Sequence, residues 1–324
     1  MARRALVLIL SVLIVGSILS QPAAGIEYPT KPVELYCPFG IGSGFDIVTR
    51  FYADTLPKYL GQKVVVINRT GAAGSVAAVE LIGSKPDGYK LQNTDSIFYA
   101  LLTKVQKVPF DPYDLSPLVI IMEYKDGIMV RGDSPWRTLN DLLDYGRKNP
   151  GKPTWAHIGR GTSEHIVGLQ IFKKAGVQAT EIAYKSSPER WTALLGGHVD
   201  AIWATYGSVK DYIRAGKMRY LVFMSKERYA EPSDVPSLTE LGFPELASLR
   251  LLMGFSVHKD TPEEIKKTLI DAFQKASNDP ILKKKLEEYG DQPRFGGPEF
   301  YMKAIKEAEE VGVPALKEMG LITK

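Results

Sequence analysis

The sequence contains almost no cysteine, since Cys37 is the only one among its 324 residues. A single cysteine excludes an intramolecular disulfide and a cysteine-based zinc site. An excess of one charge is also missing, because 41 Lys and Arg residues stand against 37 Asp and Glu residues. This balance predicts no nucleic-acid partner, which would favour a concentrated basic face. With 44% hydrophobic residues the chain is not disordered, and its length is sufficient for two domains.

A long apolar run occurs only at the N-terminus. It follows Arg3 and Arg4, extends to Ile18, and precedes the small residues Ala24 and Gly25. This order of basic, apolar and small residues is typical of a signal peptide over residues 1–25, cleaved near Ala24 or Gly25. The run is short for a membrane span of about 20 residues. We therefore expect the mature protein outside the cytoplasm.

Short β-branched runs then alternate with amphipathic stretches, which predicts βαβ units and parallel sheets. The strands are expected at 33–37, 64–67, 89–94, 118–121, 128–130, 154–157, 180–184, 201–204, 220–224 and 251–257. The helices are expected at 45–60, 74–82, 139–147, 163–174, 188–195, 262–277, 281–289 and 298–311. Two units of strand, glycine-rich loop and helix stand in separate halves of the chain.

The first glycine-rich loop runs from Phe39 to Asp46. Glycines let backbone N–H groups approach an anion, and the N-terminus of the following helix favours negative charge. Phe45 replaces the third glycine of a dinucleotide fingerprint, and the loop has no Walker lysine, so we expect no nucleotide cofactor. Asp46 is interpreted first as the helix N-cap and second as a ligand contact.

The second glycine-rich loop covers Ile158 to Ser163. A serine-hydrolase elbow is not indicated, because His165 stands where a glycine is needed, and Ser163 fits a helix cap. His157 and His165 are possible metal ligands, but no third histidine or paired carboxylate is recognisable, so no metal is expected. Arg160 is either solvated or turned into a cleft toward an anion.

Several segments of this sequence resemble the solute receptors of tripartite tricarboxylate transporters, the Bug-type periplasmic binding proteins. The similar segments are collinear over nearly the whole mature chain. They are Tyr28–Val33, Pro38–Asp46, Gly61–Val66, Asn68–Gly74, Pro86–Tyr89, Pro109–Pro112, Gly159–His165, Tyr184–Lys185, Ala193–Asp200 and Asp234–Ser237.

The resemblance implies an α/β fold of the periplasmic binding protein type, a type II-like Venus flytrap with two lobes, each a mostly parallel sheet flanked by helices. Residues 26–126 and 253–324 would form the first lobe and residues 127–252 the second, with crossings near Lys125–Ile128 and Leu251–Phe255. It implies a monomeric periplasmic receptor without enzymatic activity or cofactor. This receptor would bind a small carboxylate and deliver it to the membrane permease subunits. A secreted α/β hydrolase and a sensor for a signalling protein are the alternatives.

The ligand-binding residues that the resemblance and the loops suggest lie on both lobes. They are Phe39, Gly40, Ile41, Gly42, Ser43, Gly44, Phe45, Asp46, Ser96, Ile158, Gly159, Arg160, Gly161, Thr162, Ser163, Tyr184, Trp203, Ala204 and Thr205. The aromatic residues Phe39, Phe45, Trp155, Tyr184, Trp203 and Tyr206 are candidates for apolar walls of the cleft, or for core positions.

Four positions depart from the family pattern. Gly44 and Phe45 replace hydroxyl residues, Arg160 replaces a frequent Asn, and Ala204 replaces a frequent acidic residue. The ammonium group of an amino acid would require a buried carboxylate. We therefore expect a dicarboxylate or an aromatic carboxylate to be favoured over an amino acid, with Arg160 as a contact for the second carboxylate.

Overall fold

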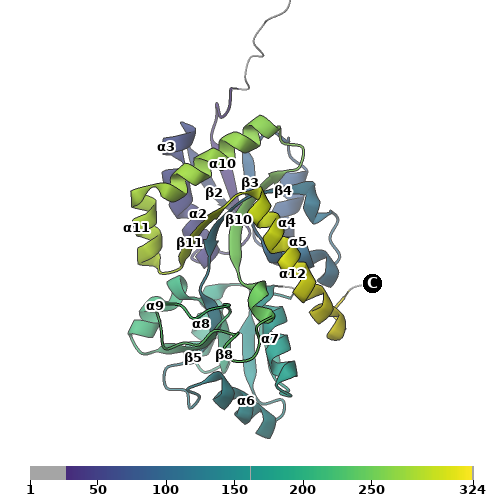
Figure 1. The fold of residues 1–324 in the computed structure, drawn as a ribbon, viewed down its shortest axis with the longest axis vertical. Helices are drawn as coiled ribbons and strands as arrows, with labels where there is room; N and C mark the ends of the chain where they lie inside the picture. The colour runs from purple at the N-terminus through teal and green to yellow at the C-terminus, as the bar shows by residue number, and fades with distance from the viewer. Residues whose placement is uncertain (1–26, 161, 323–324) are drawn as a thin grey trace, which may run out of the picture.

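The computed structural model describes residues 27–160 and 162–322, which form two α/β lobes stacked along the long axis of the molecule (Figure 1). The expected signal peptide and its cleavage site lie outside the described residues. Within the part that is described, no helix is both long and apolar enough to cross a bilayer.

The first lobe is built on a six-stranded sheet in the order β11-β4-β10-β3-β1-β2. Its strands are β1 (Val33–Cys37), β2 (Val64–Asn68), β3 (Lys90–Asp95), β4 (Leu115–Glu123), β10 (Leu252–His258) and β11 (Gln292–Gly296). Its helices are α2 (Gly44–Thr55), α3 (Pro57–Leu60), α4 (Ser75–Ile82), α5 (Ser96–Val105), α10 (Glu263–Asn278), α11 (Pro280–Tyr289) and α12 (Pro298–Glu318).

The second lobe is built on a five-stranded sheet in the order β7-β6-β8-β5-β9. Its strands are β5 (Asp126–Arg131), β6 (Thr154–His157), β7 (Thr180–Ala183), β8 (Ala201–Thr205) and β9 (Met218–Phe223). Its helices are α6 (Leu139–Lys148), α7 (Ser163–Lys174), α8 (Ser187–Leu195) and α9 (Tyr206–Arg214).

Both sheets are mixed rather than mostly parallel. β10 runs antiparallel to β3 and β4, and β5 runs antiparallel to β8 and β9. β5 and β10 are the first strands after the two passages between lobes, where no helical crossover returns the chain to the same sheet. The constraint that makes βαβ strands parallel is therefore absent at these two points.

Several elements differ from the expectation. The first expected helix ends at Thr55, and α3 begins with Pro57. The strand expected to be buried at 64–67 is a half-exposed edge strand. Helices α5 and α9 and strand β11 were not expected. The first two turns of α5 are buried on all sides, so its sequence carries little amphipathic period.

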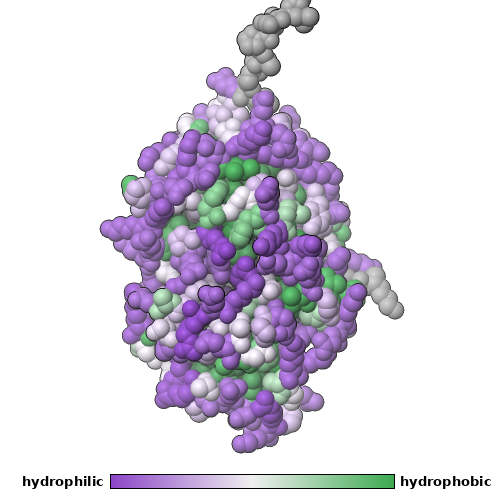
Figure 2. Space-filling view, in the orientation of Figure 1, coloured by the Kyte–Doolittle hydropathy of each residue, from purple (hydrophilic) through white to green (hydrophobic). Residues whose placement is uncertain are grey.

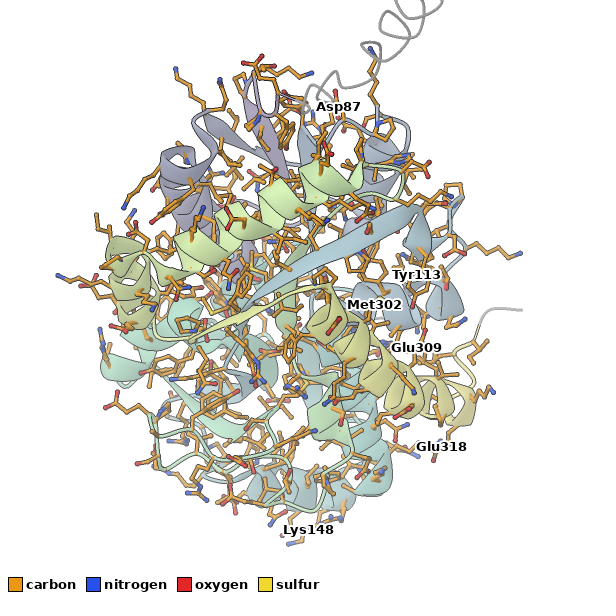
Figure 3. All side chains as sticks on the ribbon, turned by 45° about the horizontal axis from the view of Figure 1, so that its top comes forward. Asp87, Tyr113, Lys148, Met302, Glu309 and Glu318 are labelled. Carbon is orange, nitrogen blue, oxygen red and sulfur yellow. The ribbon has the colours of Figure 1, made fainter. Side chains whose placement is uncertain are left out.

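The longest helix, α12, connects the two lobes. It begins beside the sheet of the first lobe and ends next to α7 of the second lobe (Figure 1). Gln170 Nε2 donates to the carbonyl of Ala315 at 3.3 Å, and Lys173 Nζ donates to the carbonyl of Glu318 at 2.9 Å. Figure 3 shows Met302, Glu309 and Glu318 in this order along the helix. The C-terminal turn of the first lobe is thus held by the second.

A second contact between the lobes joins the start of α9 to the end of α11. The hydroxyls of Ser208 and Tyr289 are hydrogen-bonded at 2.8 Å. The buried carboxylate of Asp291 accepts the N–H of Lys125 at 2.8 Å and that of Gly207 at 3.3 Å. Burial raises the pKa of Asp291 to about 7, although both backbone hydrogen bonds oppose this shift. Asp291, a carboxyl group with a raised pKa, therefore hydrogen-bonds to the segment that connects the lobes and to α9 of the second lobe.

Candidate functional site

The first glycine-rich loop connects β1 to α2. Ser43 is the N-cap of α2, because its hydroxyl accepts the N–H of Asp46 at 3.2 Å. Gly42 adopts a left-handed backbone conformation with φ of +81°, which favours glycine. The loop thereby reaches the start of α2 with its small residues facing the other lobe.

Asp46 is not the N-cap that the sequence suggested. Its carboxylate accepts the N–H of Gly42 at 3.0 Å and donors from Arg50 and Asn68 at 2.8–3.1 Å. Burial on its own would raise the pKa of Asp46, but the hydrogen bonds from Arg50 and Asn68 hold it below its ordinary value. Asp46 is only 2% exposed, and its hydrogen bond with Gly42 holds the shape of the loop from the buried side.

The second glycine-rich loop connects β6 to α7. Thr162, rather than Ser163, caps α7, since its hydroxyl accepts the N–H of His165 at 3.4 Å. The same hydroxyl donates to the carbonyl of Gly159 at 2.8 Å. Gly161 lies outside the described residues. Both loops therefore reach a helix N-terminus through a hydroxyl cap.

Two adjoining cavities lie between these loops. Both are lined by Phe39 and Phe45 of the first lobe, by Ile158 and Glu164 of the second, and by Leu251 of the passage between lobes. The cavities therefore share a wall in which both lobes take part, which is where a two-lobed receptor would enclose a ligand.

The first cavity has the more polar lining of the two, and we refer to it as the polar cavity. Its other lining residues are Gly40, Ser43, Gly44, Lys185, Ser186, Ser187, Arg190, Trp191 and Thr205. The guanidinium of Arg190 is paired with Glu164, and both side chains are nearly fully buried. Nε of Arg190 and Nε1 of Trp191 are buried and have no hydrogen-bond acceptor among the described residues. The lining residues Lys185, Ser186 and Ser187 carry donors that a ligand with acceptor oxygens can use.

The second cavity is predominantly apolar. Its other lining residues are Ala73, Asp95, Ile97, Phe98, Leu102, Thr162 and Ser163. The carboxylate of Asp95 accepts the N–H of Phe98 at 2.7 Å and caps α5. Burial raises the pKa of Asp95 to about 6, although this hydrogen bond opposes the shift. This cavity can enclose the apolar body of a ligand whose charged end lies in the first.

The structure brings only some of the suggested residues to the cavities. Those that line one or both are Phe39, Gly40, Ser43, Gly44, Phe45, Ile158, Thr162, Ser163 and Thr205. Those that line neither are Ile41, Gly42, Asp46, Ser96, Gly159, Arg160, Tyr184, Trp203 and Ala204. Ile41 is 73% exposed, whereas Trp203 and Ala204 belong to the core. Trp155, offered as a wall or a core residue, is also core.

Sequence reasoning missed Arg190, Glu164, Lys185 and Trp191. A signal for Arg190 was present, because this cation stands on α8 at helical spacing from the buried Ala193 and Leu194. A charged residue on the apolar face of a helix indicates a buried partner or a ligand.

Arg160 points away from both cavities. Its side chain is 70% exposed, and its guanidinium lies 3.1 Å from the carboxylate of Glu181 on β7. Glu181 also faces two imidazoles, with Oε2 at 3.0 Å from Nε2 of His165 and 3.8 Å from Nε2 of His157. The arginine proposed as a carboxylate contact is thus paired within its own lobe.

A larger cavity lies between β11, the first turns of α12 and the segment 225–230. Figure 2 shows that strongly hydrophilic residues cross the middle of one face of the molecule. The cavity is lined by Lys226, Arg228, Arg250, Arg294 and Lys303 together with Glu123, Glu227 and Glu307. Its five cations outnumber its three acids, although Arg294 is paired with Glu123 at 2.8 Å and Arg250 with Glu307 at 3.6 Å. Neither glycine-rich loop reaches it, so the cavities between the loops are the candidate ligand site.

Comparison with known proteins identifies the family. The family model described as tripartite tricarboxylate transporter family receptor (TctC) matches residues 48–321. The chain belongs to this family. A curated relative from Cupriavidus necator, the UPF0065 protein in the gbd 5′ region, is 32% identical over 92% of this chain and 88% of its own length. BugT of Bordetella pertussis is 29% identical over 75% of this chain and 76% of its own length.

Solved structures of similar proteins show the same two-lobed architecture. The periplasmic binding protein BugD is 25% identical with a TM-score of 0.83, covering 92% of this chain and all of its own. An R. palustris protein solved with adipate is 25% identical with a TM-score of 0.84, covering 91% of this chain and 99% of its own. These likenesses confirm the expected family, the two-lobed α/β fold and the assignment as a periplasmic solute-binding protein.

Proposed function

We propose that this TctC-type receptor binds a small carboxylate between its two glycine-rich loops and delivers it to the membrane subunits of a tripartite transporter. The observation that carries this proposal is the pair of cavities between the two loops, the more polar of which is lined by Lys185 and by the hydroxyl residues Ser186 and Ser187. A carboxylate supplies acceptors for these donors. The relative solved with adipate supports the same class of ligand.

The charges around the cavities favour a dicarboxylate or an apolar monocarboxylate over an amino acid. The carboxylate of Glu164 is already paired with Arg190 and accepts the N–H of Ile158 at 3.3 Å. Asp95 already caps α5. Neither acid is therefore available to an ammonium group without losing a partner. Lys185 lines the polar cavity and forms no ion pair with a described residue, so it can meet a second carboxylate.

A thermal-shift screen tests this function. The purified mature protein is heated with mono-, di- and aromatic carboxylates, with the matching amides, and with free aspartate and glutamate. A ligand at 100 times its Kd stabilises the folded state by about 2.7 kcal/mol. We expect a carboxylate to raise the Tm while its amide analogue does not. Equal stabilisation by acid and amide, or tight binding of the amino acids alone, would contradict the proposal.

A further inference from the structure

His157, His165 and Glu181 meet at the edge of the second lobe, outside both cavities. His157 ends β6, Glu181 lies on the neighbouring parallel strand β7, and His165 lies in the first turn of α7. One ligand atom of each residue lies within 4.8 Å of the other two. We propose that these residues form a binding site for a transition-metal dication of the zinc class, in addition to the carboxylate site.

The distances suit a small tetrahedral ion. Zinc bonds of about 2.0–2.1 Å to nitrogen and oxygen place two ligand atoms about 3.3 Å apart. Here Glu181 Oε2 lies 3.0 Å from His165 Nε2 and 3.8 Å from His157 Nε2. The ligand nitrogens of the two imidazoles lie within 4.8 Å of each other, so metal binding would draw the two rings together. Two imidazoles and one carboxylate leave a fourth position for water.

The surroundings of the three side chains also suit a metal. Both imidazoles are nearly fully buried, with exposures of 1%. The rings of His157 and His165 lie against each other, with their centroids 4.7 Å apart. Arg160 engages the other oxygen of Glu181, Oε1, and leaves Oε2 directed at the histidines. The cation of Arg160 weakens metal affinity by repulsion, but it does not occupy the ligating oxygen.

Metal binding has a structural consequence for the second loop. Nδ1 of His157 accepts the N–H of Gly159 at 3.1 Å, so the ring proton resides on Nε2. Ligation through Nε2 moves this proton to Nδ1 and ends the hydrogen bond to Gly159. His157 and His165 flank the loop of residues 158–163, so an ion between them would tie both of its ends together.

Isothermal titration of the metal-free, untagged protein with Zn²⁺ tests the site. We expect one Zn²⁺ per chain, and a loss of affinity of about tenfold or more in Glu181→Gln. Arg160→Gln should bind Zn²⁺ more tightly. His198→Gln is the matched control, because His198 lies outside the cluster, and it should bind as the wild type does. Equal affinity in Glu181→Gln and wild type would overturn the proposal.

Nuclear magnetic resonance of the histidine rings gives a readout independent of substitution. The chain has only four histidines, so their ring nitrogens can be resolved. Zn²⁺ should shift the nitrogen resonances of Nε2 in His157 and His165. It should also transfer the ring proton of His157 from Nε2 to Nδ1. Unchanged spectra of these two rings at saturating Zn²⁺ would place any bound metal elsewhere and overturn the site. Carboxylate affinity is not used in either test, so failure of this site leaves the proposed function untouched.

Discussion

The guanidinium of Arg190 and the carboxylate of Glu164 pair inside the wall of the polar cavity, with only 2% and 4% of their side chains exposed. A pair buried to this extent differs from a surface ion pair, because removing one partner leaves an isolated charge in a poorly solvated place. The pair therefore determines both the stability of the cleft wall and its charge.

Arg190→Met and Glu164→Met should each lower the free energy of unfolding by about 3–5 kcal/mol, whereas the double variant should be less destabilised than the two singles added together. Urea denaturation at pH 7 measures this. Arg228→Met is the control, because its pair with Glu240 is about 40% exposed and should contribute under about 1 kcal/mol. Strictly additive single and double effects would show that the pair is not coupled.

Gly44→Ala should weaken carboxylate binding by about tenfold or more, since a Cβ at this position has no room. It would lie 2.9 Å from the hydroxyl of Thr205 and 3.1 Å from that of Tyr289. The two lobes would have to separate at this point. Gly40→Ala in the same loop is the control, because its Cβ would make an ordinary contact of 3.8 Å with Ser186. Calorimetry that finds both variants equally affected would refute this explanation.

Lys185→Gln should lower the affinity for a dicarboxylate by about tenfold. The affinity for its monoacid counterpart should fall much less, as expected for the loss of one charged hydrogen bond. Arg160→Gln should change both affinities by less than about twofold, because Arg160 is paired with Glu181 and solvated. Each variant removes one positive charge from the second lobe, so calorimetry compares them directly. A larger loss of dicarboxylate affinity in Arg160→Gln than in Lys185→Gln would indicate that Arg160 is the anion contact.

Asp291→Asn should remove a pH dependence of stability. The folded-state pKa of about 7 exceeds the ordinary value of an unfolded aspartate. Between pH 4 and 7 the folded protein thus holds a proton that the unfolded chain has lost, and this contribution disappears as the pH rises through 7. The advantage of wild type over variant in unfolding free energy should fall by on the order of 3 kcal/mol from pH 4 to pH 8. If the difference in unfolding free energy between wild type and Asp291→Asn is the same at every pH, this prediction is wrong.

The positions of single helices and strands were easier to predict from the sequence than the path of the chain between the lobes. β1, β6 and α7 lie at the expected residues, because each combines a clear apolar pattern with a glycine or hydroxyl boundary. The antiparallel placement of β5 and β10 depends on which lobe the chain enters, and no local pattern encodes that choice. α5 was missed because burial around most of its circumference removes the helical period.

The positions of the two loops and part of the lining of the candidate site also followed from the sequence, but the partners of its charged side chains did not. Glycines and hydroxyls mark a turn before a helix wherever it lies, so Phe39–Asp46 and Ile158–Ser163 could be located from residue types alone. The partners of charged side chains depend on distant elements. Glu181 is separated from Arg160 by 21 positions and from His157 by a whole helix, and it determines what both can do.

The interior proline of α12, Pro314, determines where this helix can bend when the two lobes move relative to each other. Pro314 lies just before the turn that is held by Gln170 and Lys173 of the second lobe. Rotation of one lobe against the other must either break those two contacts or flex the helix. Flexure concentrates at Pro314, because a proline has no N–H to complete the helical ladder. The stiffness with which the receptor opens is therefore set partly near its C-terminus, more than 100 residues beyond either ligand loop.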